Sequence, residues 1–177
     1  ILWCGNNEIA IAWHGWGWKE ELPNSVWEDY AKIFHEFLPE VCRNLDSKRL
    51  YWPSSPGYTT KLPKNNQIYG SGDHHFWGVW HGGDGFEAFE ENIGRFLSEY
   101  GMQSFPEMGT IMKFAEEKDL DINSKVMKER QKASLGTGNL IKYIEDYFSP
   151  QTDFRSIVVL SQIMQAFAIK AAVEIHR

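Results

Sequence analysis

The segment "LWCGNNE", residues 2–8, reads as a short strand that ends on a carboxylate. Apolar residues open the segment, and a Gly-Asn-Asn turn signal comes immediately before Glu8. This position matters because side chains at the carboxyl ends of strands in a βα fold converge on one site. Further strands of this kind elsewhere in the chain would therefore predict both the fold and the location of its site.

Three later segments have the apolar and β-branched or aromatic character of strands. They are residues 49–53, 75–80 and 95–100, the last of which contains Glu99. Helical periodicity is expected over residues 26–44, where Ser25 and Glu28 fit a capping box, over 86–93, and through most of the chain after Pro106. Residues 9–24 and the polar stretch after Pro53 are expected to be loops.

Strands that alternate with helices in this way predict an α/β fold with a parallel sheet. Four strands could form an open sheet that stands alone, or they could belong to a closed (β/α)8 barrel. A complete barrel takes roughly 250 residues. The 177 residues of this chain would then hold only part of it.

The charge and hydropathy of the chain exclude several classes of partner. The formal net charge is −6, with no basic stripe, which argues against nucleic acid or an anionic membrane surface. We found no apolar run long enough for a transmembrane helix. The chain does not begin with Met, so the compartment stays open, and a secreted, periplasmic or lysosomal location is compatible with the sequence. Cys4 and Cys42 could be free thiols or one disulfide.

Aromatic residues are the compositional departure, at 15% of the chain with eight Trp. Several of these lie in the Gly-containing stretch "WHGWGW", residues 13–18. Flat aromatic faces suit the C–H faces of sugar rings, and Trp is also enriched at protein–protein contacts. The stretch therefore predicts either sugar binding or a protein partner, and packing under the loop is an equal alternative.

Glu8 and Glu99 each end a predicted strand, three βα units apart. If both strands belong to one barrel, the two carboxylates face each other across its mouth. A facing carboxyl pair is the machinery of glycoside hydrolysis. The chain has 24 acidic residues, however, and a single Glu near a strand end is more often solvated or caps a helix.

Three motifs resemble family 2 glycoside hydrolases in the form shown by their β-mannosidases. "WCGNNE" (residues 3–8) resembles the segment with the Asn-Glu pair that carries the acid/base. "RFLSEYGMQSFPE" (95–107) is similar to the nucleophile segment, and "GDHHFWGVWHG" (72–82) to the strand between them. The motifs occur in the order and spacing of that family.

The resemblance implies a fold and a mechanism. The fold would be part of a (β/α)8 TIM barrel, from about strand four to the helices after strand seven. The whole chain, residues 1–177, would be a partial catalytic domain. Barrel strands one to three and eight, and flanking β-sandwich domains, would lie outside it. The reaction would be retaining hydrolysis of a terminal β-linked mannose, with Glu99 as nucleophile, Glu8 as acid/base and Asn7 bound to the sugar 2-OH.

Further side chains are expected around the sugar. Trp16 or its neighbour Trp18, in the loop after Glu8, is expected to stack on substrate. His75 and Trp77 lie two apart on one predicted strand and so share a face, which the resemblance places toward the pocket. No cofactor is implied. A metal site made by His74, His75 and His81 is not expected, because successive strand residues point to opposite faces.

Other interpretations remain beside this one. The chain could have another family 2 activity such as β-galactosidase. It could be a carbohydrate-binding or inactive fragment without turnover. It could also be a complete small α/β protein whose Trp cluster binds a protein partner.

Overall fold

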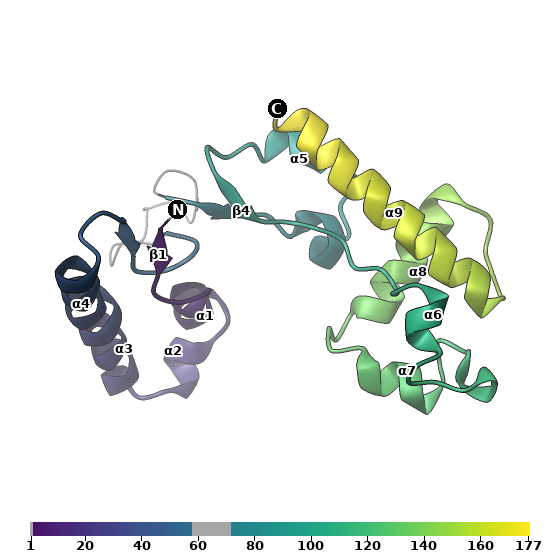
Figure 1. Cartoon of the computed structure of the whole chain (residues 1–177), viewed down its shortest axis with the longest axis horizontal. Helices are drawn as coiled ribbons and strands as arrows, with labels where there is room; N and C mark the ends of the chain where they lie inside the picture. The colour runs from purple at the N-terminus through teal and green to yellow at the C-terminus, as the bar shows by residue number, and fades with distance from the viewer. Residues whose placement is uncertain (1, 58–71) are drawn as a thin grey trace. The chain divides into compact units, whose positions relative to one another are not determined.

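A computed structural model describes residues 2–57 and 72–177 (Figure 1), and the chain forms two compact units. The first unit comprises residues 1–75 and 94–99, and the second comprises 76–93 and 100–177. The loop predicted after Pro53 lies largely in residues 58–71, outside the described part. Strands and helices are both present, and every strand pair is parallel, which confirms the predicted α/β class.

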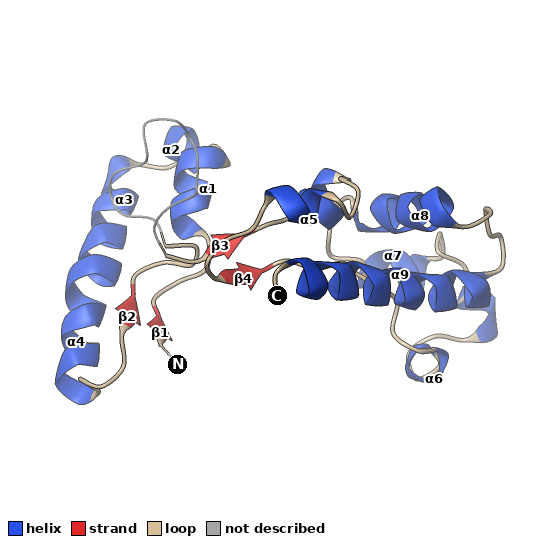
Figure 2. Ribbon diagram, turned by 90° about the horizontal axis from the view of Figure 1, so that it is seen from above, coloured by secondary structure: helices blue, strands red, loops and turns tan. Residues whose placement is uncertain are grey.

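The described part of the first unit contains two pairs of short parallel strands (Figure 2). Strand β1 (Trp3–Cys4) pairs with β2 (Tyr51–Trp52), with Trp3 opposite Tyr51. Strand β3 (His74–His75) pairs with β4 (Leu97–Glu99), with His75 opposite Glu99. An isolated parallel bridge from Asn7 to Ser55 continues the β1–β2 direction beyond the strands.

Helices connect β1 to β2, as a parallel pair requires. They are α1 (Ile9–Gly15), α2 (Trp18–Glu21), α3 (Asn24–Ala31), the π-helical η1 (Lys32–Phe37) and α4 (Leu38–Leu45). The last three run without a break, as the predicted helix over residues 26–44 requires. Ser25 is not the cap, because Pro23 holds that position and gives no side-chain cap. The predicted loop over residues 9–24 is also wrong, since α1 and α2 occupy most of it.

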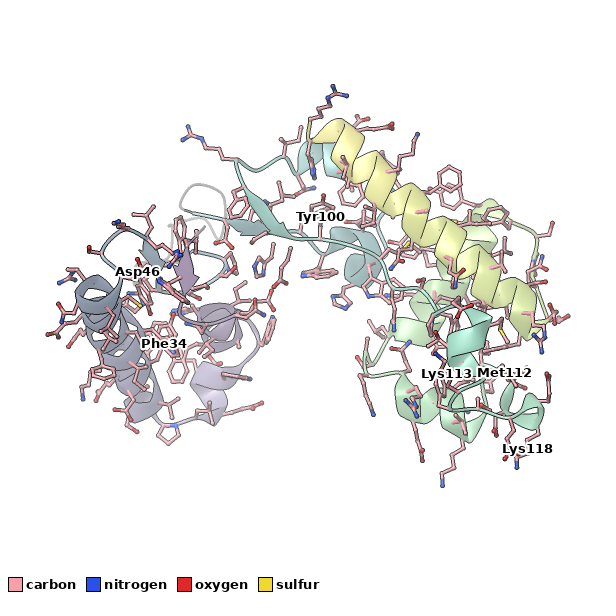
Figure 3. All side chains as sticks on the ribbon, in the orientation of Figure 1. Phe34, Asp46, Tyr100, Met112, Lys113 and Lys118 are labelled. Atoms are coloured by element: carbon pink, nitrogen blue, oxygen red, sulfur yellow. The ribbon has the colours of Figure 1, made fainter. Side chains whose placement is uncertain are left out.

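The helical rod α3–η1–α4 packs against the strands through aromatic and polar contacts. Phe34 lies on the rod (Figure 3). A Cβ added to Gly5 would come within 2.9 Å of the Phe34 ring. That Cβ would also meet the backbone oxygen of Pro53 at 2.5 Å, so only glycine permits this approach. At the far end of the rod, Asp46 accepts a hydrogen bond of 3.1 Å from the Trp3 indole.

The second unit is mainly helical. It contains η2 (Gly78–Gly82), α5 (Ala88–Glu91), α6 (Met108–Ile111), η3 (Glu117–Asp119), α7 (Lys125–Arg130), α8 (Gly136–Tyr147) and α9 (Phe154–Ile175). One apolar cluster joins α6, α7 and the start of α9 through Ile111, Met127, Phe154 and Val158. The Tyr143 hydroxyl ties α8 to η2, accepting from Trp80 N at 2.9 Å and donating to Asp84 O at 2.7 Å.

Helix α9 corrects one expectation about membrane spans. Among the described residues it is the one helix long and apolar enough to cross a membrane, with 22 residues and a mean hydropathy of 1.6. Only the length and the composition of α9 meet this criterion, and core helices of soluble proteins meet it too. In this unit α9 packs against α8 and α5. The Asp153 side chain caps it, and the hydrogen bond from Ser156 N holds the pKa of that carboxyl below its usual value.

Candidate active site

Glu8 stands at the junction between β1 and α1 in an unusual backbone conformation. It precedes Ile9, the first residue of α1, with φ 58° and ψ 9°, in the left-handed region. For a residue other than glycine this costs about 1–2 kcal/mol, and such residues concentrate at functional sites. The Glu8 amide donates to Ser55 O at 2.8 Å, which ties the junction to the chain after β2.

Asn6 holds the turn that presents Glu8. Its side-chain nitrogen donates to Pro53 O at 2.8 Å, and its side-chain oxygen accepts from Ile9 N and from the Ser54 hydroxyl, each at 3.2 Å. One amide thus satisfies donors from α1 and from the segment after β2. The first Asn of the "NNE" motif is therefore a structural residue that stabilises the strained Glu8 backbone.

His75 is the centre of the site, at the end of β3. Its Nδ1 lies 2.7 Å from Glu8 Oε1 and 3.4 Å from Glu99 Oε2. Its side chain is only 2% exposed, whereas the Glu8 and Glu99 side chains are 16% and 33% exposed. The imidazole is therefore a buried bridge beneath two carboxylates that solvent can reach.

The two carboxylates, Glu8 and Glu99, are far apart in the sequence and lie together in the structure. One ligand atom of each of Glu8, His75 and Glu99 lies within 4.8 Å of the other two. Parallel pairing places His75 opposite Glu99 on β3 and β4, and the turn after β1 brings in Glu8. The three side chains belong to the same compact unit.

Behind His75 lies a second layer of polar groups centred on Asp73. The ring Nε2 is 2.9 Å from the Ser55 hydroxyl oxygen and 3.7 Å from Asp73 Oδ2. Asp73, 7% exposed, accepts hydrogen bonds from the hydroxyls of Ser55 and Ser98 and from Gly57 N, the last at 2.7 Å. The site is thus a hydrogen-bonded series from a buried carboxylate, through a hydroxyl and an imidazole, to two accessible carboxylates.

The comparisons with known proteins agree on one class of enzyme. The β-mannosidase B of Aspergillus terreus is 35% identical over 175 residues, and that of Aspergillus flavus is 31% identical. The crystal structure of the β-D-mannosidase from Dictyoglomus thermophilum matches 99% of this chain with a TM-score of 0.82 and 37% identity. The chain is β-mannosidase-like. It covers 20% of each Aspergillus relative and 21% of the Dictyoglomus chain, about a fifth of their length, and no family model matches it.

The other side chains expected at a β-mannosidase site differ from one another in how exposed they are. Asn7 adjoins Glu8 and is exposed. Trp16 ends α1 with 56% of its surface exposed, and Trp18 is also exposed. Trp13, in contrast, is buried and stacks on Trp27 with ring centroids 5.4 Å apart. The Trp cluster therefore divides into one packing residue and two that are free to meet a ligand.

Trp77 does not share a strand with His75, so that part of the prediction is wrong. Strand β3 ends at His75, and Trp77 immediately precedes η2 in the second unit, with its ring centroid 5.0 Å from that of His81. The expected strand over residues 75–80 ends at His75, and farther along the stretch Trp80 has a φ of 82°. The aromatic composition of this stretch favoured a strand, but a residue with positive φ cannot continue one.

Two contacts of the site were not predicted. The sequence places Ser55 at the mouth of the site but not against His75, and Asp73 was not a candidate residue, although it stands two before His75 in the "GDHH" motif. Such spacing puts two side chains on one face of a strand, and that signal could have identified Asp73. Ser55 had no comparable signal. Cys4 and Cys42 are both free thiols.

Proposed function

We propose that this chain is the part of a β-mannosidase that carries both catalytic carboxylates. The observation that carries the proposal is the close approach of Glu8 and Glu99 around His75, with oxygens of the two carboxylates within 4.8 Å. Retaining glycosidases place their carboxyl groups about 5–5.5 Å apart, and inverting enzymes about 6.5–9.5 Å apart. The spacing supports a retaining mechanism.

In this mechanism Glu99 is the nucleophile. Its carboxylate oxygen attacks the anomeric carbon of a terminal β-mannosyl unit, and the bond from that carbon to the leaving oxygen breaks. Protonated Glu8 gives its proton to the leaving oxygen. The Glu8 carboxylate then takes a proton from water, whose oxygen displaces Glu99 and frees the sugar with its original configuration.

The residues around the pair have supporting roles. Asn7 would donate to the sugar 2-OH, and exposed Trp16 would stack on a sugar ring. The four strands would be strands four to seven of a (β/α)8 barrel, a proposal supported by their parallel pairing. The remaining strands and the flanking domains would come from other parts of the same protein, since the relatives are about five times longer.

The test is hydrolysis by the complete enzyme that carries this segment. We expect cleavage of an aryl β-mannoside in strong preference to the matching β-galactoside. Proton NMR of the first-formed sugar should show the β anomer, because two displacements at the anomeric carbon restore its configuration. Initial α-mannose would indicate inversion, a faster β-galactoside reaction would indicate another family 2 activity, and absence of turnover would leave only sugar binding.

A second candidate is a metal-dependent hydrolase, because Glu8, His75 and Glu99 are all metal-ligating types within 4.8 Å of one another. The contact between His75 and Glu8 fits a shared proton better than a shared metal ion. Ligands about 2.0–2.1 Å from tetrahedral zinc lie roughly 3.3 Å apart. His75 Nδ1 and Glu8 Oε1 are 2.7 Å apart, which is a direct hydrogen bond.

We therefore expect chelation to leave activity unchanged. The complete enzyme dialysed against EDTA should cleave an aryl β-mannoside at the rate of the untreated enzyme. Loss of activity that added Zn²⁺ restores would instead support the metal-dependent mechanism.

A further inference from the structure

The hydrogen bonds behind His75 determine which of its ring nitrogens carries a proton. A serine hydroxyl has one proton to donate. The Ser55 hydroxyl lies against Asp73 Oδ2, an acceptor-only carboxylate that also receives the Ser98 hydroxyl and Gly57 N. The Ser55 proton therefore points to Asp73, and its oxygen presents lone pairs to His75 Nε2 at 2.9 Å.

That arrangement requires a proton on Nε2. The Asp73 carboxylate, 3.7 Å from the same nitrogen, favours it further by its charge. The ring is 2% exposed, so water does not compete for the position. With Nε2 protonated, a neutral His75 has only a lone pair at Nδ1, facing Glu8 and Glu99.

A lone pair opposite two ionised carboxylates is repulsive, so the 2.7 Å contact between Nδ1 and Glu8 needs a proton of its own. We propose that Ser55 and Asp73 are positioning residues that, by keeping Nε2 protonated, make the Glu8–His75 pair retain one further proton. That proton is the one the leaving oxygen receives. The inference rests on the proposed function and deepens it, because it explains how the acid keeps its proton beside the ionised Glu99.

Removing the Ser55 hydroxyl should release this constraint. In Ser55→Ala the Nε2 proton loses its acceptor, and a neutral ring can place its proton on Nδ1 and donate to an ionised Glu8. The deprotonated acid is thereby stabilised. The groups facing His75 in the described structure are Glu8, Ser55, Asp73 and Glu99. Of these, Asp73 still favours a proton on Nε2 through its charge, but at 3.7 Å it is too far to accept a hydrogen bond in place of Ser55.

The experiment compares two substrates in the complete enzyme. Methyl β-mannoside needs a proton on its leaving oxygen, whereas dinitrophenyl β-mannoside does not. We expect Ser55→Ala to lower kcat/KM roughly 10- to 100-fold for the first, the range seen when a partner that orients a histidine is lost, and less than about threefold for the second. The basic limb of the pH profile for methyl β-mannoside should move to lower pH.

Three further variants separate this role from a structural one. Ser55→Thr keeps the hydroxyl and should restore both rate and pH profile. Asp73→Asn frees the Ser55 proton and should act in the same direction as Ser55→Ala, which provides a test if the latter misfolds. Ser98→Ala removes a donor to Asp73 without touching His75, so any loss should be equal for both substrates.

Equal losses on both substrates in Ser55→Ala, with an unmoved basic limb, would overturn the proposal and leave Ser55 a structural residue. The proposed function would survive that result as long as Glu8→Gln still discriminates between the substrates. If Glu8→Gln does not discriminate either, the assignment of the acid/base itself is wrong.

Discussion

Replacing Glu99 by alanine is expected to lower kcat for an aryl β-mannoside by at least about 10⁴-fold in the complete enzyme. In the proposed mechanism the variant has no oxygen to form the covalent intermediate, and the remaining groups act only on the leaving oxygen. Glu99 is the most exposed of the three central side chains, so its truncation removes little packing. Release of the aryl alcohol, followed by absorbance, measures the rate.

Added azide provides a specific check on this role. In Glu99→Ala a small anion can enter the vacated space and attack the anomeric carbon directly, so the product should be the α-mannosyl azide. Glu145→Ala is the matched control, because Glu145 is an exposed residue of α8 in the second unit, and its rate should equal that of the wild type. A Glu99→Ala enzyme within tenfold of wild type would exclude Glu99 as the nucleophile.

Replacing Glu8 by alanine is expected to have an effect that depends on the leaving group. Loss of general acid–base assistance costs about 10²- to 10⁴-fold. We expect that loss with methyl β-mannoside, while dinitrophenyl β-mannoside should still form the glycosyl-enzyme at nearly the normal rate. A burst of dinitrophenol followed by a slow steady state, observed by stopped flow, would show that the second step is now limiting.

Azide should rescue the Glu8→Ala variant with the opposite stereochemistry. It needs no base to attack the glycosyl-enzyme, so turnover of dinitrophenyl β-mannoside should rise and yield the β-mannosyl azide. The pair of azide products thus assigns the two carboxylates independently of their rates. An α-azide from Glu8→Ala and a β-azide from Glu99→Ala would mean that the roles are reversed.

Much of the secondary structure could be predicted, and each error came from a misleading local residue type. The helix over residues 26–44 and the short strands around Tyr51 and Leu97 follow from periodicity and β-rich composition. Helices α1 and α2 were missed because Gly15 and Gly17 read as loop residues, whereas each lies at a helix end. Strand β3 was drawn too long because apolar aromatic residues continue past His75 into a turn.

The sequence by itself determined that this chain carries two carboxylates at the ends of strands in a β-mannosidase-like pattern, because strand and turn signals are local and the motifs are contiguous. Only the tertiary structure decided that Glu8, His75 and Glu99 touch, and that Ser55 and Asp73 stand behind the imidazole. Those contacts join residues up to three strands apart along the chain. Their geometry depends on parallel pairing and on the left-handed turn at Glu8, neither of which any single stretch of sequence encodes.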